Sequence, residues 1–183
     1  MIVNSVGFDG GRRVAVAFLV TAIATAIAMP HASATTINIV ALGASNTAGK
    51  GVGASAAWPA RLEAMLRAKG YDVSVTNSGI RGDDTSGMLA RVGAVPNGTQ
   101  IVILDKAASS DRRRDINTNA NIAAIVARLR ARGIRSIVIE GMHGWANNQL
   151  QADGIHITEA GHAAVAARLQ PMVIAAIGGR WRR

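Results

Sequence analysis

Two short segments at opposite ends of the chain carry the residue types that a nucleophilic hydrolase needs. Ser45 lies in a Gly-Ala-Ser-Asn-Thr segment directly after an apolar run, and Asp153 and His156 lie three positions apart on a glycine-containing turn. A carboxylate at that spacing can hold the imidazole Nδ1–H while Nε2 faces a serine hydroxyl. An imidazole oriented in this way activates the serine as a nucleophile. The sequence therefore predicts a catalytic triad of Ser45, His156 and Asp153.

Each segment also has a simpler interpretation. A Gly/Ser/Asn cluster after a strand is commonly only a turn, and an Asp/His pair before a helix is commonly a cap. The segment Gly49-Lys50-Gly51 lacks the spacing of a phosphate-binding loop. The occurrence of both polar segments in one chain, one after the first apolar run and one before the last helical pattern, favours the catalytic interpretation.

From Thr36 onward, short apolar runs alternate with helical patterns. The runs are rich in β-branched residues and predict four strands: Ile37 to Leu42, Tyr71 to Thr76, Ile101 to Leu104 and Ile134 to Ile139. Three of them are nearly continuous in apolar character, as is typical of strands covered on both faces. The order predicts an α/β fold, a three-layer α/β/α sandwich with a parallel, flavodoxin-like sheet. Reactive groups should then gather at the carboxyl ends of the strands.

Three segments have the periodicity and end signals of helices. One begins near Pro59 and ends at Gly70, and a second runs from Asn121 to Arg132 before a glycine. Thr158 is expected to cap the last helix at its N-terminus. Pro171 is expected to kink that helix or end it early.

The first 34 residues have the pattern of a secretory signal peptide. Arg12 and Arg13 precede an apolar run from Val14 to Ala28, and Ala32-Ser33-Ala34 offers the small residues that a signal peptidase accepts. The run is shorter than the roughly 20 residues of a bilayer span, which favours export over a membrane anchor. We expect residues 35–183 to form a single exported domain, periplasmic or secreted, with no transmembrane segment after cleavage. The chain has no cysteine, which excludes disulfides and thiolate metal sites.

The chain has a net charge of +9, a balance often found in nucleic-acid-binding proteins. Its arginines are spread over Arg112 to Arg114, a predicted helix and the C-terminal tail from Arg180 to Arg183, and only 3% of its residues are aromatic. Nucleic acid is therefore disfavoured as a partner, because few side chains can stack on bases. Solvated helix faces and a basic tail account for the charge. Attraction to anionic lipid or polysaccharide surfaces remains an alternative.

The motifs and their order resemble those of the SGNH/GDSL-type hydrolases, small exported α/β esterases, lysophospholipases and thioesterases, over Ile37 to Val173. Gly43-Ala44-Ser45 looks like the first block of the family, Asn77-Ser78-Gly79 like the second, and Asp153-Gly-Ile-His156 like the last. The resemblance implies that Ser45 is the nucleophile and that Gly79 donates its backbone N–H to the oxyanion. No cofactor is expected, and the four histidines lack the spacing of a metal site.

The third block departs from the family pattern. The family has Gly-x-Asn-Asp after the third strand, whereas this chain reads Asp-Lys-Ala-Ala-Ser-Ser-Asp from Asp105 to Asp111, which puts Ser109 in the place of the asparagine. A serine hydroxyl is shorter than the amide and must rotate to donate to the oxyanion. Losing one preorganised donor typically costs on the order of 10²- to 10³-fold in turnover.

Two functions follow from these patterns. The first is a serine esterase that acts on an acyl ester, a carboxylic ester, lysophospholipid or thioester, through an acyl-enzyme, with activity weakened by the lost asparagine. The alternative is a catalytically impaired exported binding protein for acyl or glycan ligands on the same scaffold.

Four further side chains have a functional and a simpler interpretation. His143 lies after the fourth predicted strand and is expected to line the substrate site, although a solvated or loop-bonded histidine is the simpler interpretation. His162 is expected to be a packing or surface residue of the last helix. Trp58 and Met142 could line an acyl pocket or belong to the core.

Overall fold

The computed structural model describes residues 35–106 and 108–179, without the side chains of residues 108 and 109. The predicted signal peptide at 1–34 and the basic tail at 180–183 lie outside the described residues.

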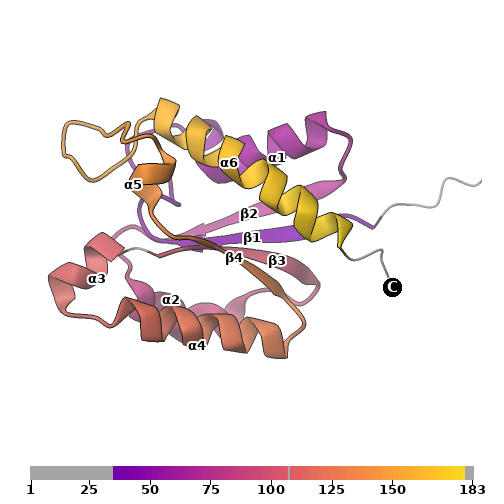
Figure 1. Cartoon of the computed structure of the whole chain (residues 1–183), viewed down its shortest axis with the longest axis horizontal. Helices are drawn as coiled ribbons and strands as arrows, with labels where there is room; N and C mark the ends of the chain where they lie inside the picture. Colours follow the sequence, from indigo (N-terminus) through magenta and orange to yellow (C-terminus); the bar gives the residue numbers. More distant parts are fainter. Residues whose placement is uncertain (1–34, 107, 180–183) are drawn as a thin grey trace, which may run out of the picture. The chain divides into compact units, whose positions relative to one another are not determined.

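A four-stranded parallel sheet forms the centre of the domain (Figure 1). Its strands are β1 (Ile37–Gly43), β2 (Val73–Gly79), β3 (Thr99–Asp105) and β4 (Arg135–Ile139), in the order β2-β1-β3-β4. This order is the flavodoxin-like one, and the chain reverses direction along the sheet beside β1. Gly43 pairs with Gly79, and Leu42 pairs with Leu104. The carboxyl ends of β2, β1 and β3 therefore lie side by side.

Helices cover both faces of the sheet, which confirms the predicted three-layer α/β/α sandwich (Figure 1). On one face lie α1 and α6, and on the other lie α2 and α4. The helices are α1 (Trp58–Ala68), α2 (Thr85–Arg91), α3 (Ala108–Arg114), α4 (Thr118–Ala131), α5 (Met142–Trp145) and α6 (Glu159–Gly178), with 3₁₀ turns at Ala54–Ala56 and Val92–Ala94.

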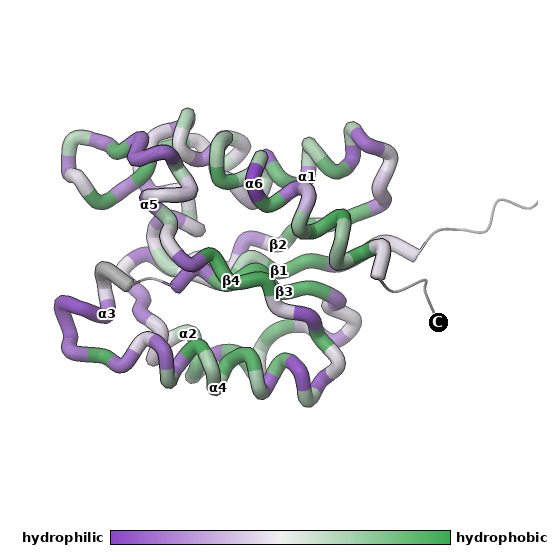
Figure 2. The backbone as a smooth tube through the Cα atoms, in the orientation of Figure 1, coloured by the Kyte–Doolittle hydropathy of each residue, from purple (hydrophilic) through white to green (hydrophobic). Residues whose placement is uncertain are grey.

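The alternation of side chains along β1 explains why both faces need a helical layer. Ile39 and Ala41 pack into the core on the α1 and α6 side, whereas Val40 and Leu42 pack into the core on the α2 and α4 side. Successive side chains of a strand point to opposite faces, so a continuous apolar run must be covered twice. Figure 2 shows the strands as a hydrophobic centre between helices of mixed character.

The helix α6 continues through Pro171 to Gly178, so the prediction that the helix ends early at this proline is wrong. Proline removes one helical hydrogen bond, at a cost of about 3 kcal/mol. The helix is buried before Pro171 through Leu169 and after it through Val173 and Ile177. The burial of these side chains offsets the cost of the lost hydrogen bond. By length and composition alone α6 would pass as a membrane span, but these buried residues belong to the core of the domain.

Candidate active site

Ser45 lies in the turn that follows the central strand β1. The Ala48 N–H donates to the Ala44 carbonyl at 2.9 Å and the Lys50 N–H donates to the Ser45 carbonyl at 3.0 Å, so the chain turns sharply after Gly43. This turn lies at the carboxyl end of β1, where parallel sheets place their ligand sites.

The structure brings Ser45, His156 and Asp153 into one row of hydrogen bonds. Ser45 Oγ lies 2.9 Å from His156 Nε2, and His156 Nδ1 lies 2.5 Å from Asp153 Oδ2. An ionised carboxylate only accepts hydrogen bonds, so the proton of this pair is on Nδ1. His156 Nε2 is then the acceptor for the Ser45 hydroxyl. Three side chains from two distant segments of the sequence thus have the arrangement of an activated nucleophile.

The carboxylate of Asp153 is kept ionised although it lies at the exposed rim of the site. Its pKa is held well below the usual value, chiefly by the hydrogen bond from the His156 backbone N–H, and further by the His156 ring and the Ile155 N–H. Both N–H groups bond the other oxygen, Oδ1, at 2.9 and 3.0 Å. One oxygen of Asp153 therefore shapes the loop, and the other orients the imidazole.

Asn46 fixes the loop of His156 from the side of the nucleophile. Its Oδ1 accepts from the Ile157 N–H at 3.0 Å, and its Nδ2 donates to the Ile155 carbonyl at 3.3 Å. The two peptide groups that it bonds flank His156 on either side. No local pattern in the sequence predicts this role of Asn46, because nothing in the sequence shows which loop meets its side-chain amide.

The turn is also fixed from β2 and β3. Asn77 Nδ2 donates to the Thr47 carbonyl at 2.9 Å, and Thr47 Oγ1 donates to Asp105 Oδ2 at 3.2 Å. The Gly79 N–H, predicted to bind the oxyanion, donates to Asn77 Oδ1 at 3.0 Å. In this structure the Gly79 N–H is therefore bonded within the protein.

Two glycines let the turn lie directly against the strand ends. A Cβ at Gly43 would lie 2.1 Å from Thr47 Oγ1, and a Cβ at Gly79 would lie 2.2 Å from the Ala48 nitrogen. Neither distance can be accommodated without moving the turn. Glycine is needed at both positions because the turn approaches the strand ends so closely. This close approach lets the turn keep its hydrogen bonds to Asn77 and Asp105.

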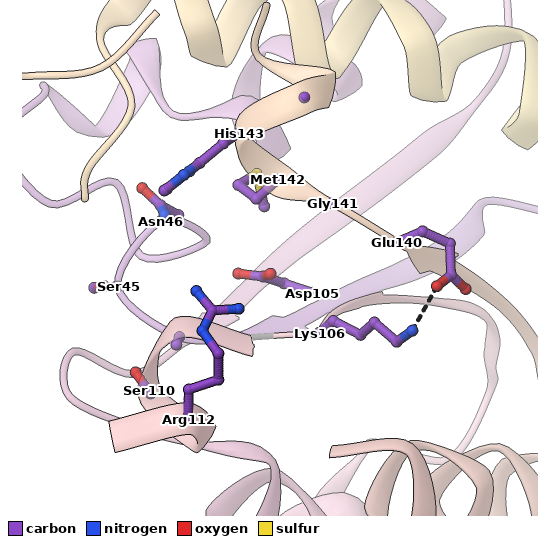
Figure 3. A pocket seen from close by; sticks show the side chains of 12 residues that line it. Ser45, Asn46, Asp105, Lys106, Ser110, Arg112, Glu140, Gly141, Met142 and His143 are labelled. Carbon is purple, nitrogen blue, oxygen red and sulfur yellow. Dashed lines mark hydrogen bonds and ion pairs between the residues drawn. The ribbon is translucent and has the colours of Figure 1, made fainter. Parts of the chain in front are cut away.

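A pocket of about 210 Å³ opens beside Ser45 (Figure 3). It is lined by the turn after β1, the chain after β3 and the chain after β4, through Ala44, Ser45, Asn46, Asp105, Lys106, Ser110, Arg112, Glu140, Gly141, Met142, His143 and Gly144. The pocket places charged side chains close to the candidate nucleophile.

The other predicted site residues have different surroundings. His143 lines the pocket, and its Nε2 donates to the Ile155 carbonyl at 2.8 Å, the same carbonyl that Asn46 bonds. Met142 also lines the pocket, whereas Trp58 is fully buried in the core. The backbone of Ser109 belongs to α3, and its side chain lies outside the described part of the chain.

His162 is a packing residue of α6, and its hydrogen bond is made to Trp58 and not to Ser45, His156 or Asp153. It is fully buried, and its Nδ1 accepts the Trp58 backbone N–H at 3.1 Å. Burial, and secondarily the charge of Arg61, lowers the pKa of His162 to about 4. Its Nε2 meets no hydrogen-bond partner among the described residues. His162 is therefore neutral at physiological pH.

Several solved structures share this architecture, and two of them are esterases. TesA matches with a TM-score of 0.68 and 22% identity over 76% of this chain and 99% of its own. The psychrotrophic esterase EstA from Pseudoalteromonas sp., inhibited by monoethylphosphonate, matches with a TM-score of 0.68 and 15% identity over 77% of this chain and 98% of its own. AlinE4, an SGNH-hydrolase family esterase, matches with a TM-score of 0.57 and 20% identity over 82% of this chain and 99% of its own.

The chain has the fold of the SGNH hydrolases, as the resemblance of its motifs implied. No protein-family model and no curated protein matches the sequence.

Proposed function

We propose that this protein is a serine esterase of the SGNH type that hydrolyses acyl esters through an acyl-enzyme. The observation that carries the proposal is the continuous row from Ser45 Oγ through His156 to Asp153, with distances of 2.9 and 2.5 Å. The likeness in fold to TesA, EstA and AlinE4 supports the same reaction class.

In the proposed reaction Ser45 Oγ attacks the ester carbonyl while its proton passes to His156 Nε2. Asp153 stabilises the imidazolium that results. The tetrahedral intermediate collapses, and His156 returns the proton to the leaving alcohol or thiol. Water then attacks the acyl-enzyme with the same histidine as base and releases the acid and free Ser45.

The oxyanion of the intermediate needs N–H donors aimed at its position. The Ser45 N–H has no other hydrogen-bond partner within residues 35–106 and 108–179 and is the first proposed donor. The Gly79 N–H joins it when the Asn77 side chain turns away from their 3.0 Å bond. Ser109 is the third proposed donor. A donor set that must rearrange supports slower turnover than a preformed one.

A second candidate is a binding protein for acyl or glycan ligands on the same scaffold. The bonded Gly79 N–H and the Asp105-Lys106 start of the altered third block favour it. Fluorophosphonate labelling separates the two candidates, because only an activated serine reacts appreciably. The EstA structure inhibited by monoethylphosphonate indicates that phosphonate chemistry suits this fold.

Export is part of the same proposal. The pattern of residues 1–34 supports secretion to the periplasm or the medium with residues 35–183 as the mature enzyme. The net charge of +9 supports contact with anionic lipid or polysaccharide surfaces at that location.

The test is hydrolysis of 4-nitrophenyl acetate by the full chain and by Ser45→Ala. We expect the Ser45→Ala rate to fall by about 10⁴-fold or more, because the triad acts as a unit. Fluorophosphonate labelling should disappear with it. Ser55→Ala is the matched control, since Ser55 is exposed and does not line the pocket. Equal rates for Ser45→Ala and the parent would contradict the proposal.

A further inference from the structure

Most of the residues that line the pocket beside Ser45 have charged or polar side chains. Among its described lining residues, Lys106 and Arg112 carry positive charge and Asp105 and Glu140 carry negative charge. Apolar side chains come from Ala44 and Met142, and Met142 is itself buried. A site for a long acyl chain would instead need a predominantly apolar lining.

One wall of the pocket is an ion pair between the ends of neighbouring strands. Lys106 and Glu140 each follow directly after the paired residues Asp105 of β3 and Ile139 of β4, and Lys106 Nζ lies 2.6 Å from Glu140 Oε2 (Figure 3). The Glu140 side chain is 66% exposed, so water solvates the pair. An alkyl chain in the pocket would strip that water without replacing its hydrogen bonds, which is unfavourable.

The size of the pocket also argues against a long chain. Its volume of about 210 Å³ lies below the roughly 300–1,000 Å³ of pockets that hold drug-sized ligands. A short acyl group and one polar ring fit this scale better than a fatty acyl chain.

The charges of the pocket cancel, two of each sign. An anionic ligand would meet Asp105 and Glu140, and a cationic ligand would meet Lys106 and Arg112. A hydroxyl group both donates and accepts hydrogen bonds, so it can use both signs. A ligand with several hydroxyl groups therefore matches this wall better than an ion or an alkyl chain.

We propose that the substrate is a short-chain ester of a polyhydroxylated alcohol, of the carbohydrate ester class, with the hydroxyl groups held beside the Lys106–Glu140 pair. This inference rests on the proposed esterase function and narrows it. It disfavours lysophospholipids and long-chain acyl thioesters, which the motifs alone left open.

The test measures kcat/KM of the full chain for two matched substrate pairs. The acyl pair is 4-nitrophenyl acetate and 4-nitrophenyl octanoate, and the alcohol pair is 6-O-acetyl methyl glucoside and hexyl acetate. We expect kcat/KM for 4-nitrophenyl acetate to exceed that for the octanoate by about tenfold or more. We expect kcat/KM for the acetylated glucoside to exceed that for hexyl acetate by a similar factor, because sites with hydrogen-bonding groups reject analogues that lack them.

Two variants test whether these ratios of kcat/KM depend on the Lys106–Glu140 ion pair. Glu140→Gln removes one charge at nearly constant size, and the double change Lys106→Met with Glu140→Leu makes the wall apolar. We expect the first to lower the glucoside preference by about threefold to tenfold and the second to lower both preferences by about tenfold or more. Glu159→Gln is the matched control: its side chain is 63% exposed and pairs with Arg61 away from the pocket. It should leave both ratios unchanged.

Fluorophosphonate labelling in the same preparations separates the two levels of the proposal. Labelling together with a preference for octanoate or hexyl acetate, or with ratios that Glu140→Gln does not move, would overturn the carbohydrate ester inference and leave the esterase intact. Absence of both labelling and hydrolysis would overturn the esterase itself. If circular dichroism shows that the double variant is unfolded, the ratios of Glu140→Gln alone decide whether the carbohydrate ester inference holds.

Discussion

Two almost fully buried histidines at the start of α6 have opposite hydrogen-bonding patterns. His156, in the loop before the helix, is 6% exposed, and its Nδ1 lies 2.5 Å from the Asp153 carboxylate. His162, in the first turns of the helix, is 0% exposed, and its Nδ1 accepts the Trp58 N–H at 3.1 Å. Nδ1 thus carries the proton in His156, whereas in neutral His162 it is a bonded acceptor and Nε2 carries the proton.

The comparison shows that burial alone does not make a histidine a base. His162 could take up a second proton only by giving up the Trp58 bond, in a site where burial lowers its pKa to about 4. His156 instead has the Asp153 carboxylate on Nδ1, which can stabilise an imidazolium, and its Nε2 accepts the Ser45 hydroxyl at 2.9 Å. The partner on Nδ1 decides which histidine can do chemistry.

The largest expected effect comes from giving His156 a partner without charge. Asp153→Asn leaves a similar shape, but its amide cannot stabilise the imidazolium and can donate to Nδ1, which puts the proton on Nε2 as in His162. We expect kcat for 4-nitrophenyl acetate to fall by about 10⁴-fold.

The control for this change is Asp72→Asn, which removes an exposed carboxylate whose partner is the Thr36 hydroxyl at 2.7 Å. It should keep the parent rate. A rate for Asp153→Asn within tenfold of the parent would show that the carboxylate is not needed.

A smaller effect is expected from the titration of His162. The folded protein keeps its pKa at about 4, whereas the unfolded chain binds the proton near 6.5. The unfolded state therefore takes up the proton first as the pH falls. The contribution of neutral His162 to stability is full above pH 6.5 and is lost as the pH falls toward 4. At about 1.4 kcal/mol per pH unit, the loss is about 3 kcal/mol.

The measurement is the free energy of unfolding in urea at pH 7, 5.5 and 4 for the parent and for His162→Asn. Asparagine does not titrate, and its Oδ1 can still accept from the Trp58 N–H. The difference in stability between the two proteins should narrow by about 3 kcal/mol between pH 7 and 4, and other groups cancel in that difference. A difference that stays constant with pH would contradict the role of His162.

The smallest expected effect concerns the loop that carries His156. Asn46→Ala removes the bonds to the Ile155 carbonyl and the Ile157 N–H, so the imidazole is held less firmly. We expect kcat to fall by about 10- to 100-fold with little change in KM, because the change misplaces the base without altering the pocket charges.

Asn46→Asp is the graded comparison, since it keeps the acceptor for Ile157 and loses the donor to Ile155. Its kcat should lie between those of the parent and Asn46→Ala. If Asn46→Ala raises KM and leaves kcat unchanged, Asn46 binds substrate instead of positioning His156.

Much of this fold follows from patterns that are local in the sequence. The apolar runs gave all four strands, although β2 begins at Val73 rather than Tyr71 and extends to Gly79, because it pairs with β1 as far as Gly43. Thr158 caps α6 as predicted, with its hydroxyl accepting from the Gly161 N–H at 3.2 Å. α2, α3 and α5 were not located, since these short helices have little apolar periodicity.

The features that were missed depend on contacts between distant segments. The passage of α6 through Pro171 depends on burial against other elements. The hydrogen bonds of the Asn46 side-chain amide join residues more than one hundred positions away in the sequence. The bond from Gly79 to Asn77 Oδ1 depends on the side-chain orientation. Motif spacing identifies which groups meet, but not the other bonds that each group makes.

The two glycines under the nucleophile turn determine how a mutational map of this protein would look. A methyl group at Gly43 or Gly79 would collide with Thr47 or Ala48 at about 2 Å. Selection for activity would mark both positions as intolerant, as strongly as the residues that handle protons. The yield of soluble protein distinguishes these cases: it would fall for alanine at either glycine and hold for Ser45→Ala. A glycine beside a nucleophile that tolerates no substitution can therefore reflect the space that a backbone needs rather than a part in the reaction.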